Sequence, residues 1–427
     1  MIICVAGILT AGAQQADSVR MDRSKLNIGA YILQPYARTE QHVRDIADCG
    51  IDFMTWVPND RKLLDLFRKY HIGAVVSDVV PGWWGGDGEK AGMLSQKNRM
   101  ELYEKRAAAF KDHPAIWGID IGDEPSALDF PYYNQVFRKV DALFPHQFPF
   151  LNLYPNYASV AKNTSEQTVN QLGTATYQEH IAEYVKHVPS DYICYDFYLY
   201  SINVWQAYEN LRVVADACLG SGRSMWIVLQ VNSNDETKWI SENELRFQAY
   251  TAMAFGAENI LWGCYTAGWW HNNVLDAKGE KTAQYDKLKR INKEIHTLAP
   301  AYMKYRRTRT DFVSFQGTQW LKGVRQESLV SLSNGVFSQL RTADNSPLVV
   351  GTMLSRSGNG DQALFVCAAD DPYDEHPVTH TLFFRADGRR ISVQGPQGPM
   401  TVRVGGDGSY SIDITSNQAL LIEAVPY

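Results

Sequence analysis

The chain has 427 residues, 45% of them hydrophobic and 21% charged, with a formal net charge of −6. This length exceeds what one compact core usually supports, so two domains are expected. The charge gives no reason to expect nucleic acid or an anionic membrane surface as a partner. Aromatic residues are abundant, with 11 Trp, 23 Tyr and 17 Phe, and several stand in Gly-rich surroundings typical of loops.

The N-terminus reads MIICVAGILTAGAQQADSVR, with an apolar run followed by the small residues AGA before Gln14. This pattern is typical of a signal peptide and its cleavage site. We therefore predict that residues 1–15 are a signal peptide or its remnant and that the mature protein is secreted or periplasmic. A buried first strand is the alternative. The apolar run is too short to span a bilayer, so no membrane insertion is expected after cleavage.

The cysteines do not form a recognisable framework. Cys4 lies in the predicted signal peptide, and the remaining five are an odd number without CxxC spacing. We predict buried free thiols rather than disulfides or a metal site. Motifs for nucleotides or metals do not occur in a convincing context, so neither a cofactor nor a metal is expected.

Short β-type runs alternate with helical patterns from residue 26 to residue 300. The helical stretches include DRKLLDLFRKY (60–70) and SENELRFQAYTAMAFG (241–256), which begin at residues that cap helices. The eight strand candidates are LNIGAYI (26–32), DFMTWV (52–57), GAVVSDV (73–79), AIWGIDIG (115–122), PFLNLY (149–154), YICYDFY (192–198), SMWIVLQV (224–231) and NILWGCY (259–265).

Strand–helix alternation predicts an α/β protein with parallel strands, because a crossover helix returns the chain to the same end of the sheet. Eight such units favour a (β/α)8 TIM barrel over residues 26–304. A doubly wound sheet is the alternative, although the first turn, YILQPYAR, lacks glycine. From residue 305 to 427, period-2 apolar alternation broken by Gly, Asn and Asp predicts a C-terminal antiparallel β-sandwich of seven to nine strands.

The fourth strand candidate ends on two adjacent acids, Asp123 and Glu124, followed by Pro125. Active sites of TIM barrels lie at the carboxyl ends of the strands, so these acids are expected at the rim of a cleft. The alternative is that Asp123 or Asp129 caps the next helix. One acid suffices for a cap, and Glu is a poor capping residue, so we interpret the pair as a candidate for chemistry.

The other strand ends carry polar and aromatic side chains, and two loops carry Trp pairs. Amide, carboxyl and phenol groups hydrogen-bond to sugar hydroxyls, and aromatic faces stack on sugar rings, so a carbohydrate substrate is predicted. Buried packing is the alternative for either Trp pair. The candidate binding residues are Asp123, Asn152, Tyr154, Tyr198, Gln230, Trp83, Trp84, Trp262, Tyr265, Trp269 and Trp270.

The motif IGDEPS and the stretch ELRFQAYTAMAFGAENILWGCY resemble the clan A glycoside hydrolases, in particular a family-42-like set of secreted bacterial proteins. The resemblance covers about residues 26–300. It implies that Glu124 is the general acid/base and that Asp123 takes the place of an Asn that contacts the sugar 2-hydroxyl. The expected function is hydrolysis of an O-glycosidic bond in a β-linked glycan.

The chain departs from this clan at the end of the seventh strand, where Gln230 stands in place of the nucleophilic Glu. Asp235 or Glu236 in the following loop is one candidate for the second carboxylate, and Asp196 at the end of the sixth strand is another. A catalytically silent carbohydrate-binding barrel is the alternative function.

Overall fold

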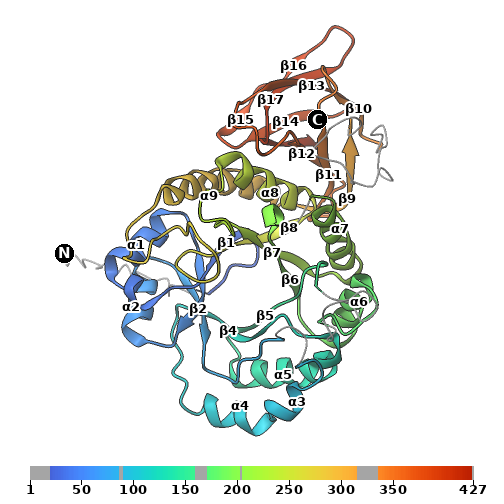
Figure 1. Cartoon of the computed structure of the whole chain (residues 1–427). Helices are drawn as coiled ribbons and strands as arrows, with labels where there is room; N and C mark the ends of the chain where they lie inside the picture. Colours follow the sequence, from blue (N-terminus) through green and yellow to red (C-terminus); the bar gives the residue numbers. More distant parts are fainter. Residues whose placement is uncertain (1–19, 86–89, 159–170, 202–203, 315–334, 426–427) are drawn as a thin grey trace, which may run out of the picture.

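The structure, a computed structural model, describes residues 20–85, 90–158, 171–201, 204–314 and 335–425. Within them, an eight-stranded parallel barrel surrounded by helices is followed by two antiparallel sheets (Figure 1). The predicted TIM barrel with a C-terminal β-sandwich is therefore confirmed. The predicted signal peptide over residues 1–15 lies outside the described residues.

Each of the eight strand candidates forms a barrel strand, with bounds within two residues of those predicted. Hydrogen bonds join the strands in the order β5-β4-β3-β2-β1-β8-β7-β6. The barrel closes where the Leu153 N–H donates to the Cys194 carbonyl at 2.9 Å, beyond the end of β5. The strands are β1 (Asn27–Tyr31), β2 (Phe53–Pro58), β3 (Gly73–Ser77), β4 (Ile116–Asp123), β5 (Phe148–Asn152), β6 (Tyr192–Phe197), β7 (Ser224–Gln230) and β8 (Ala257–Gly263).

Helices between the strands begin at the caps that the sequence indicates. The side chains of Thr39, Asp60 and Ser241 accept backbone N–H groups at the starts of α1, α2 and α8. The α-helices are α1 (Glu40–Asp48), α2 (Arg61–Lys69), α3 (Leu94–Lys97), α4 (Met100–Ala107), α5 (Phe130–Leu143), α6 (Tyr177–His187), α7 (Val204–Ser221), α8 (Glu242–Ala254) and α9 (Ala283–Tyr302), and the 3-10 helices are η1 (Pro35–Ala37), η2 (Ala127–Asp129) and η3 (Leu199–Ser201).

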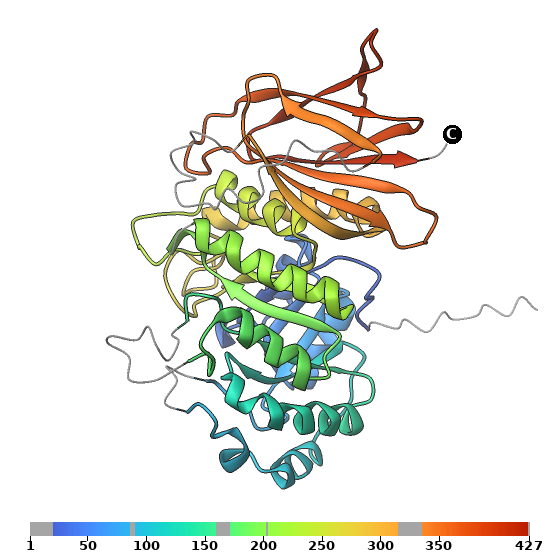
Figure 2. The ribbon, with the colours of Figure 1, turned by 90° about the vertical axis from the view of Figure 1, so that its right-hand side faces the viewer.

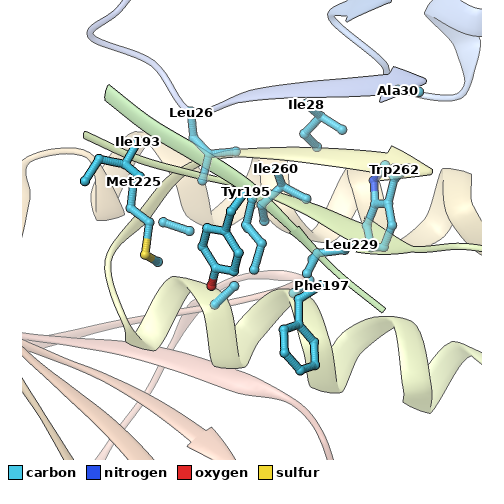
Figure 3. Packing of buried hydrophobic residues seen from close by; sticks show 14 of the residues in the cluster. Leu26, Ile28, Ala30, Ile193, Tyr195, Phe197, Met225, Leu229, Ile260 and Trp262 are labelled. Carbon is cyan, nitrogen blue, oxygen red and sulfur yellow. The ribbon is translucent and has the colours of Figure 1, made fainter. Parts of the chain in front are cut away.

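Successive residues of the barrel strands point alternately to the helices and to the barrel interior. Figure 3 shows Tyr195 and Phe197 of β6 in the cluster on the helix side, together with Trp262 of β8. Cys194 belongs to the separate cluster inside the barrel. Alternation therefore directs Asp196, two residues further on, to the interior at the carboxyl end of β6.

Aromatic packing closes the amino end of the barrel. The rings of Tyr192 and Trp226 stack at 4.3 Å, and the Arg23 guanidinium lies over the rings of Trp226 and Phe148 at 5.2 and 4.8 Å. The space for a ligand is consequently at the opposite end, where the strands finish.

The C-terminal domain consists of two antiparallel sheets, β10-β13-β17-β16 and β15-β14-β18-β12-β11-β9, which enclose their own apolar core. It has ten strands among the described residues, whereas seven to nine were predicted. The count includes two very short strands, β15 and β16, of three and two residues. The strands are β9 (Tyr305–Val313), β10 (Phe337–Thr342), β11 (Leu348–Ser355), β12 (Gln362–Ala368), β13 (Thr379–Ala386), β14 (Arg390–Gly395), β15 (Gly398–Met400), β16 (Arg403–Val404), β17 (Tyr410–Thr415) and β18 (Ala419–Val425).

The six-stranded sheet packs on helices α8 and α9 of the barrel (Figure 2). The Phe365 ring contacts the rings of Tyr302 and Tyr250, with centroids 5.3 and 6.5 Å apart, and the Cys367 thiol donates to the Tyr250 carbonyl. The sandwich thus rests on the outside of the barrel, in apolar contact with two helices.

The five cysteines of the described chain, Cys49, Cys194, Cys218, Cys264 and Cys367, are buried free thiols, as predicted. Across the same residues, no helix combines the length and the apolar character that crossing a membrane requires.

Candidate active site

A cleft of about 570 Å³ opens at the carboxyl ends of the barrel strands. One part of its wall comes from β4, β5 and β6 and is rich in carboxyl groups. The part that comes from β1, β2 and the loop after β8 is aromatic. The cleft is lined by Tyr31, Trp56, Gly82, Trp83, Trp84, Asp120, Gly122, Asp123, Glu124, Asn152, Asp196, Tyr198 and Trp269.

Glu124 stands directly after β4, and its backbone has a left-handed φ of +46°. Its N–H donates to the Asn152 carbonyl at 2.8 Å, which fixes the turn to the end of β5. The Trp84 indole N–H donates to Oε2 of Glu124 at 3.2 Å. A non-Gly residue in this conformation is strained and needs such support, which is common at functional sites. The carboxyl group of Glu124 is therefore held in the cleft by β4, β5 and the loop after β3.

The loop after β3 delivers Trp83 and Trp84 by pairing with β4. The Asp123 N–H donates to the Trp83 carbonyl at 2.7 Å, and the Gly85 N–H donates to the Asp123 carbonyl at 3.0 Å. A Cβ on Gly85 would lie 1.7 Å from the Glu124 carbonyl oxygen, so only glycine allows this approach. This Trp pair consequently reaches the cleft through backbone contacts.

The helix after β4 does not use the acid pair as a cap. The Ser126 hydroxyl accepts the Leu128 N–H at the start of η2. The carboxylate of Asp129 accepts the N–H of Gly92, in the loop before α3, and the N–H of Leu94, the first residue of α3. These contacts leave Asp123 and Glu124 to line the cleft, where the sequence places them.

Asp123 and Asp196 are joined by the side chain of Asn152. The Nδ2 group of Asn152 donates to Oδ1 of Asp123 at 3.0 Å and to Oδ1 of Asp196 at 2.8 Å. Burial raises the pKa of both carboxyls, and the charge of Asp123 raises that of Asp196 further, while the Asn152 hydrogen bonds lower both. The two acids therefore form one coupled pair, in which ionisation of one opposes ionisation of the other.

Asp120 is a cleft residue that the sequence analysis did not identify. It lies three residues before Asp123, so in a regular strand the two would face opposite sides. The pairing of β4 with β5 shifts register between Asp120 and Gly122, and Gly122 has a φ of +152°. This irregularity turns both acids to the cleft. Burial, with the charge of Asp123, raises the pKa of Asp120 to about 8. The available signal was an acid inside an otherwise apolar strand.

The aromatic wall combines the predicted Trp269 with Tyr31 and Trp56, which were missed. Their rings meet edge to face, with centroids 5.8 Å apart for Tyr31–Trp56, 6.0 Å for Tyr31–Trp269 and 6.5 Å for Trp56–Trp269. Tyr31 ends β1 and Trp56 lies near the end of β2. The strand-end rule applied to the other strands would have found both. The predicted Tyr198 packs against Trp269, with centroids 5.8 Å apart.

Gln230 does not line the cleft. Its side chain is fully buried, Oε1 accepts the Tyr200 N–H at 3.0 Å, and Nε2 donates to the Ser201 hydroxyl and the Asn232 carbonyl. All these contacts fasten the end of β7 to neighbouring loops. The structure thus places the predicted binding residue Gln230 outside the cleft lining, with its amide bonded to Tyr200, Ser201 and Asn232.

The loop acids also lie outside the cleft. Asp235 accepts the N–H and hydroxyl of Thr237, and Glu236 is exposed next to it. Neither is among the cleft-lining residues. The structure therefore does not bring either acid to Glu124.

Four predicted aromatic binding residues, Trp262, Tyr265, Tyr154 and Trp270, do not line the cleft. Trp262 is fully buried and donates its indole N–H to Asn292 of α9. Tyr265 is fully buried in the core between strands and helices. Tyr154 is buried with its hydroxyl close to Gly85, and the half-buried Trp270 packs edge to face on the ring of Tyr198, with centroids 4.8 Å apart.

No family model matches the chain, and no curated protein matches it. Similar solved structures include a GH2 β-galacturonidase from Eisenbergiella tayi bound to glycerol (13% identity, 62% of this chain and 50% of that one, TM-score 0.45). Another is xylanase 10B from Thermotoga maritima (13% identity, 64% of this chain and 96% of that one, TM-score 0.41). A third is endoglucanase Cel5A from Pseudomonas stutzeri (13% identity, 62% of this chain and 93% of that one, TM-score 0.40). At these identities and TM-scores the likeness assigns no role to any residue of this chain.

Proposed function

We propose that the cleft hydrolyses the O-glycosidic bond of a glycan, with Glu124 as general acid/base and Asp196 as the second carboxylate. The observation that carries this proposal is that carboxyl groups from β4 and β6 line one cleft together with an aromatic wall. Most glycoside hydrolases hold the glycosidic bond that they cleave between two carboxyl groups of the enzyme. Aromatic faces stack on the apolar faces of sugars. The preference for a β-linkage rests on the clan A resemblance.

Glu124 suits the acid role because of its position at the mouth of the cleft. Glu124 is partly exposed beside Trp84, a residue that is 50% exposed, so a departing sugar or aglycone has a way out. In the proposed reaction, the glycosidic C–O bond breaks as Glu124 gives its proton to the leaving oxygen. A water molecule supplies the new oxygen at the anomeric carbon, and its proton returns to a carboxylate.

Asp196 is favoured over Asp235 and Glu236 as the second carboxylate because it lines the same cleft as Glu124. The charges of Asp196 and Glu124 both raise the pKa of the Tyr157 phenol, beyond the effect of burial, so both lie near one hydroxyl. A nucleophile or general base must be ionised, and the hydrogen bond from Asn152 stabilises the ionised form of Asp196.

The test is a hydrolysis screen on a panel of α- and β-linked oligosaccharides with wild type, Glu124→Gln and Asp196→Asn. Glu236→Gln is the matched control, since it removes an acid at the same end of the barrel but outside the cleft. We expect wild type and Glu236→Gln to cleave the same substrate and both cleft variants to lose most activity. Full activity of Glu124→Gln would contradict the proposal. Binding of glycans by wild type without any cleavage would support the sugar-binding barrel instead.

We also propose that the protein acts outside the cytoplasm, on the basis of the apolar run and AGA pattern at the N-terminus. N-terminal sequencing of the protein isolated from its source tests this. Recovery of a chain that begins near Gln14 supports export, and a chain that retains residues 1–13 contradicts it.

A further inference from the structure

The carboxyl groups of the cleft are not balanced by basic side chains. Among the described residues that line the cleft, four are acids and none is Lys, Arg or His. The neighbouring charges that shift the pKa values of Asp120 and Asp196 are those of other acids. Lys90 lies at the mouth, with its ammonium group 5.3 Å from the centre of the exposed Trp84 ring. The interior of the cleft therefore has an uncompensated negative potential whenever its acids ionise.

Buried acids elsewhere in the protein are compensated by the protein itself. Glu294 forms an ion pair with Arg246 at 2.8 Å, and Asp129 accepts two backbone N–H groups at 2.9 and 3.0 Å. In the cleft, the Asn152 amide nitrogen is shared by Asp123 and Asp196, each of which has one backbone N–H in addition, and Asp120 accepts one N–H at 3.2 Å, but no cation among the described lining residues accompanies them. Because a buried carboxylate needs donors or a cation, this contrast indicates that a ligand supplies what the protein does not.

A ligand that favours the ionised forms of these acids donates hydrogen bonds and carries positive charge. When they are ionised, Asp120, Asp123 and Asp196 only accept hydrogen bonds, and they then present a wall of acceptors. An ammonium group brings three donors and one charge, and charge-assisted hydrogen bonds of this kind are the strong ones. A uronate or other anionic sugar would be repelled by the same wall.

The aromatic side of the cleft points to the same ligand. The rings of Tyr31, Trp56 and Trp269 attract a cation to their faces and stack on the apolar face of a sugar. The Tyr31 hydroxyl and the Trp83 indole N–H are buried and have no hydrogen-bond partner among the described residues. These donors call for oxygen acceptors on the ligand, as hydroxyl groups and a ring oxygen provide. A bare cation would leave them unused.

We propose that the cleft selects an amino sugar, a glycoside whose ring carries a free ammonium group, over neutral, N-acylated and uronate sugars. The ammonium group contacts the acid wall formed by Asp120, Asp123 and Asp196, and the sugar ring packs on the aromatic wall. That the bound sugar is a substrate rests on the proposed function, whereas its selection is a matter of binding alone.

The test measures binding to the wild-type full chain by calorimetry, with two series of four methyl thioglycosides that resist hydrolysis. They carry an amino group, an acetamido group, a hydroxyl group or a 6-carboxylate on the same ring, in both gluco and galacto series. We expect the amino member to bind at least about tenfold more tightly than the neutral member at pH 7, and the carboxylate to bind most weakly. Asp120→Asn should reduce this preference severalfold, and the control Glu236→Gln should retain it.

Proton release provides a second measurement that does not depend on a variant. Burial raises the pKa values of Asp120 and Asp196, so part of these groups is protonated in the free protein. An ammonium group favours the ionised forms, and its binding should therefore release protons, detected as a dependence of the binding heat on the buffer. The neutral thioglycoside should release fewer protons than the amino one.

Equal affinity for the amino and neutral members, or tighter binding of the carboxylate, would overturn the inference. Displacement of the amino sugar by Ca²⁺ or Mg²⁺ at comparable concentration would also overturn it, since the acid wall would then be a metal site. The outcome is separable from the proposed function. Selective binding of amino sugars without cleavage of any glycoside would contradict only the proposed hydrolase activity. Cleavage of neutral glycosides without a preference for amino sugars would contradict only this inference.

Discussion

Asp123 and Asp196 belong to different strands, yet their carboxylates accept hydrogen bonds from the same amide nitrogen, at 3.0 and 2.8 Å. The nitrogen is that of Asn152, which ends the strand beside β4. One donor thus holds two acids that would otherwise repel each other at the base of the cleft. The ionisation of the site depends on this amide, which makes it the first target for mutation.

Asn152→Leu keeps the approximate shape of the side chain but removes the shared donor. The hydrogen bonds from Asn152 lower the pKa values of both acids, so their loss should raise these pKa values. If Asp196 must be ionised for catalysis, the acid limb of the kcat/KM profile should move to higher pH by about one unit. An unchanged limb together with reduced kcat would indicate that Asn152 only positions the substrate.

Glu124→Gln keeps the shape of the proposed acid but removes its transferable proton. It should reduce kcat by roughly 10²–10⁴-fold for glycosides with poor leaving groups. The phenolate of an aryl glycoside with an acidic phenol departs without protonation, so cleavage of these substrates should be much less affected. Asp196→Asn should be inactive on both substrate types, as a nucleophile or base requires. Equal losses on both types for Glu124→Gln would argue that this residue does not act as an acid.

The stability of the protein should fall as the pH rises from about 5 to 8.5, in part because of Asp120. Burial raises its pKa to about 8 in the folded state, far above the ordinary 3.8, so the folded protein holds a proton that the unfolded chain releases. Stability from this group is present at low pH and is lost as the pH rises toward the folded-state pKa. The Asp120→Asn variant lacks this ionisable carboxyl group, so its stability should not show this part of the pH dependence.

The difference in unfolding free energy between wild type and Asp120→Asn should therefore change with pH, by on the order of 2 kcal/mol. This is less than full conversion of the shift, because Asp120 keeps part of its surface in the cleft. Denaturant unfolding of both proteins at pH 5 and pH 8.5 measures it. If the unfolding free energies of the two proteins change with pH in parallel, the Asp120 carboxyl group titrates near its ordinary pKa.

Trp84 and Trp262 are a matched pair for separating binding from packing. Trp84 is 50% exposed in the cleft, whereas Trp262 is fully buried with its indole N–H bonded to Asn292. Trp84→Ala should raise KM about tenfold with little change in Tm, because it removes a stacking face. Trp262→Ala should cost about 3–5 kcal/mol of stability. A large loss of Tm in Trp84→Ala would assign that residue to packing.

Much of the fold was readable from the sequence because its signals are local. Alternation of strands and helices, caps such as Thr39 and Ser241, and period-2 patterns beyond residue 305 all depend on near neighbours in the chain. The acid pair at the end of β4 was placed at the rim by the same reasoning, since every parallel strand of a barrel ends on one face. Trp262, in contrast, was predicted in the binding site, and only the structure shows that it shares the helix-facing side of β8 with Ile260 (Figure 3).

The membership of the cleft was decided only by the tertiary structure. The irregularity in β4 turns Asp120 to the same side as Asp123, against the period-2 pattern. Gln230 is on the interior phase of β7, but its side-chain oxygen accepts the N–H of Tyr200 in η3. Contacts between residues far apart in the chain fix which strand-end side chains meet. The sequence by itself determined the barrel and the end at which its chemistry lies, and long-range packing determined which acids share that space.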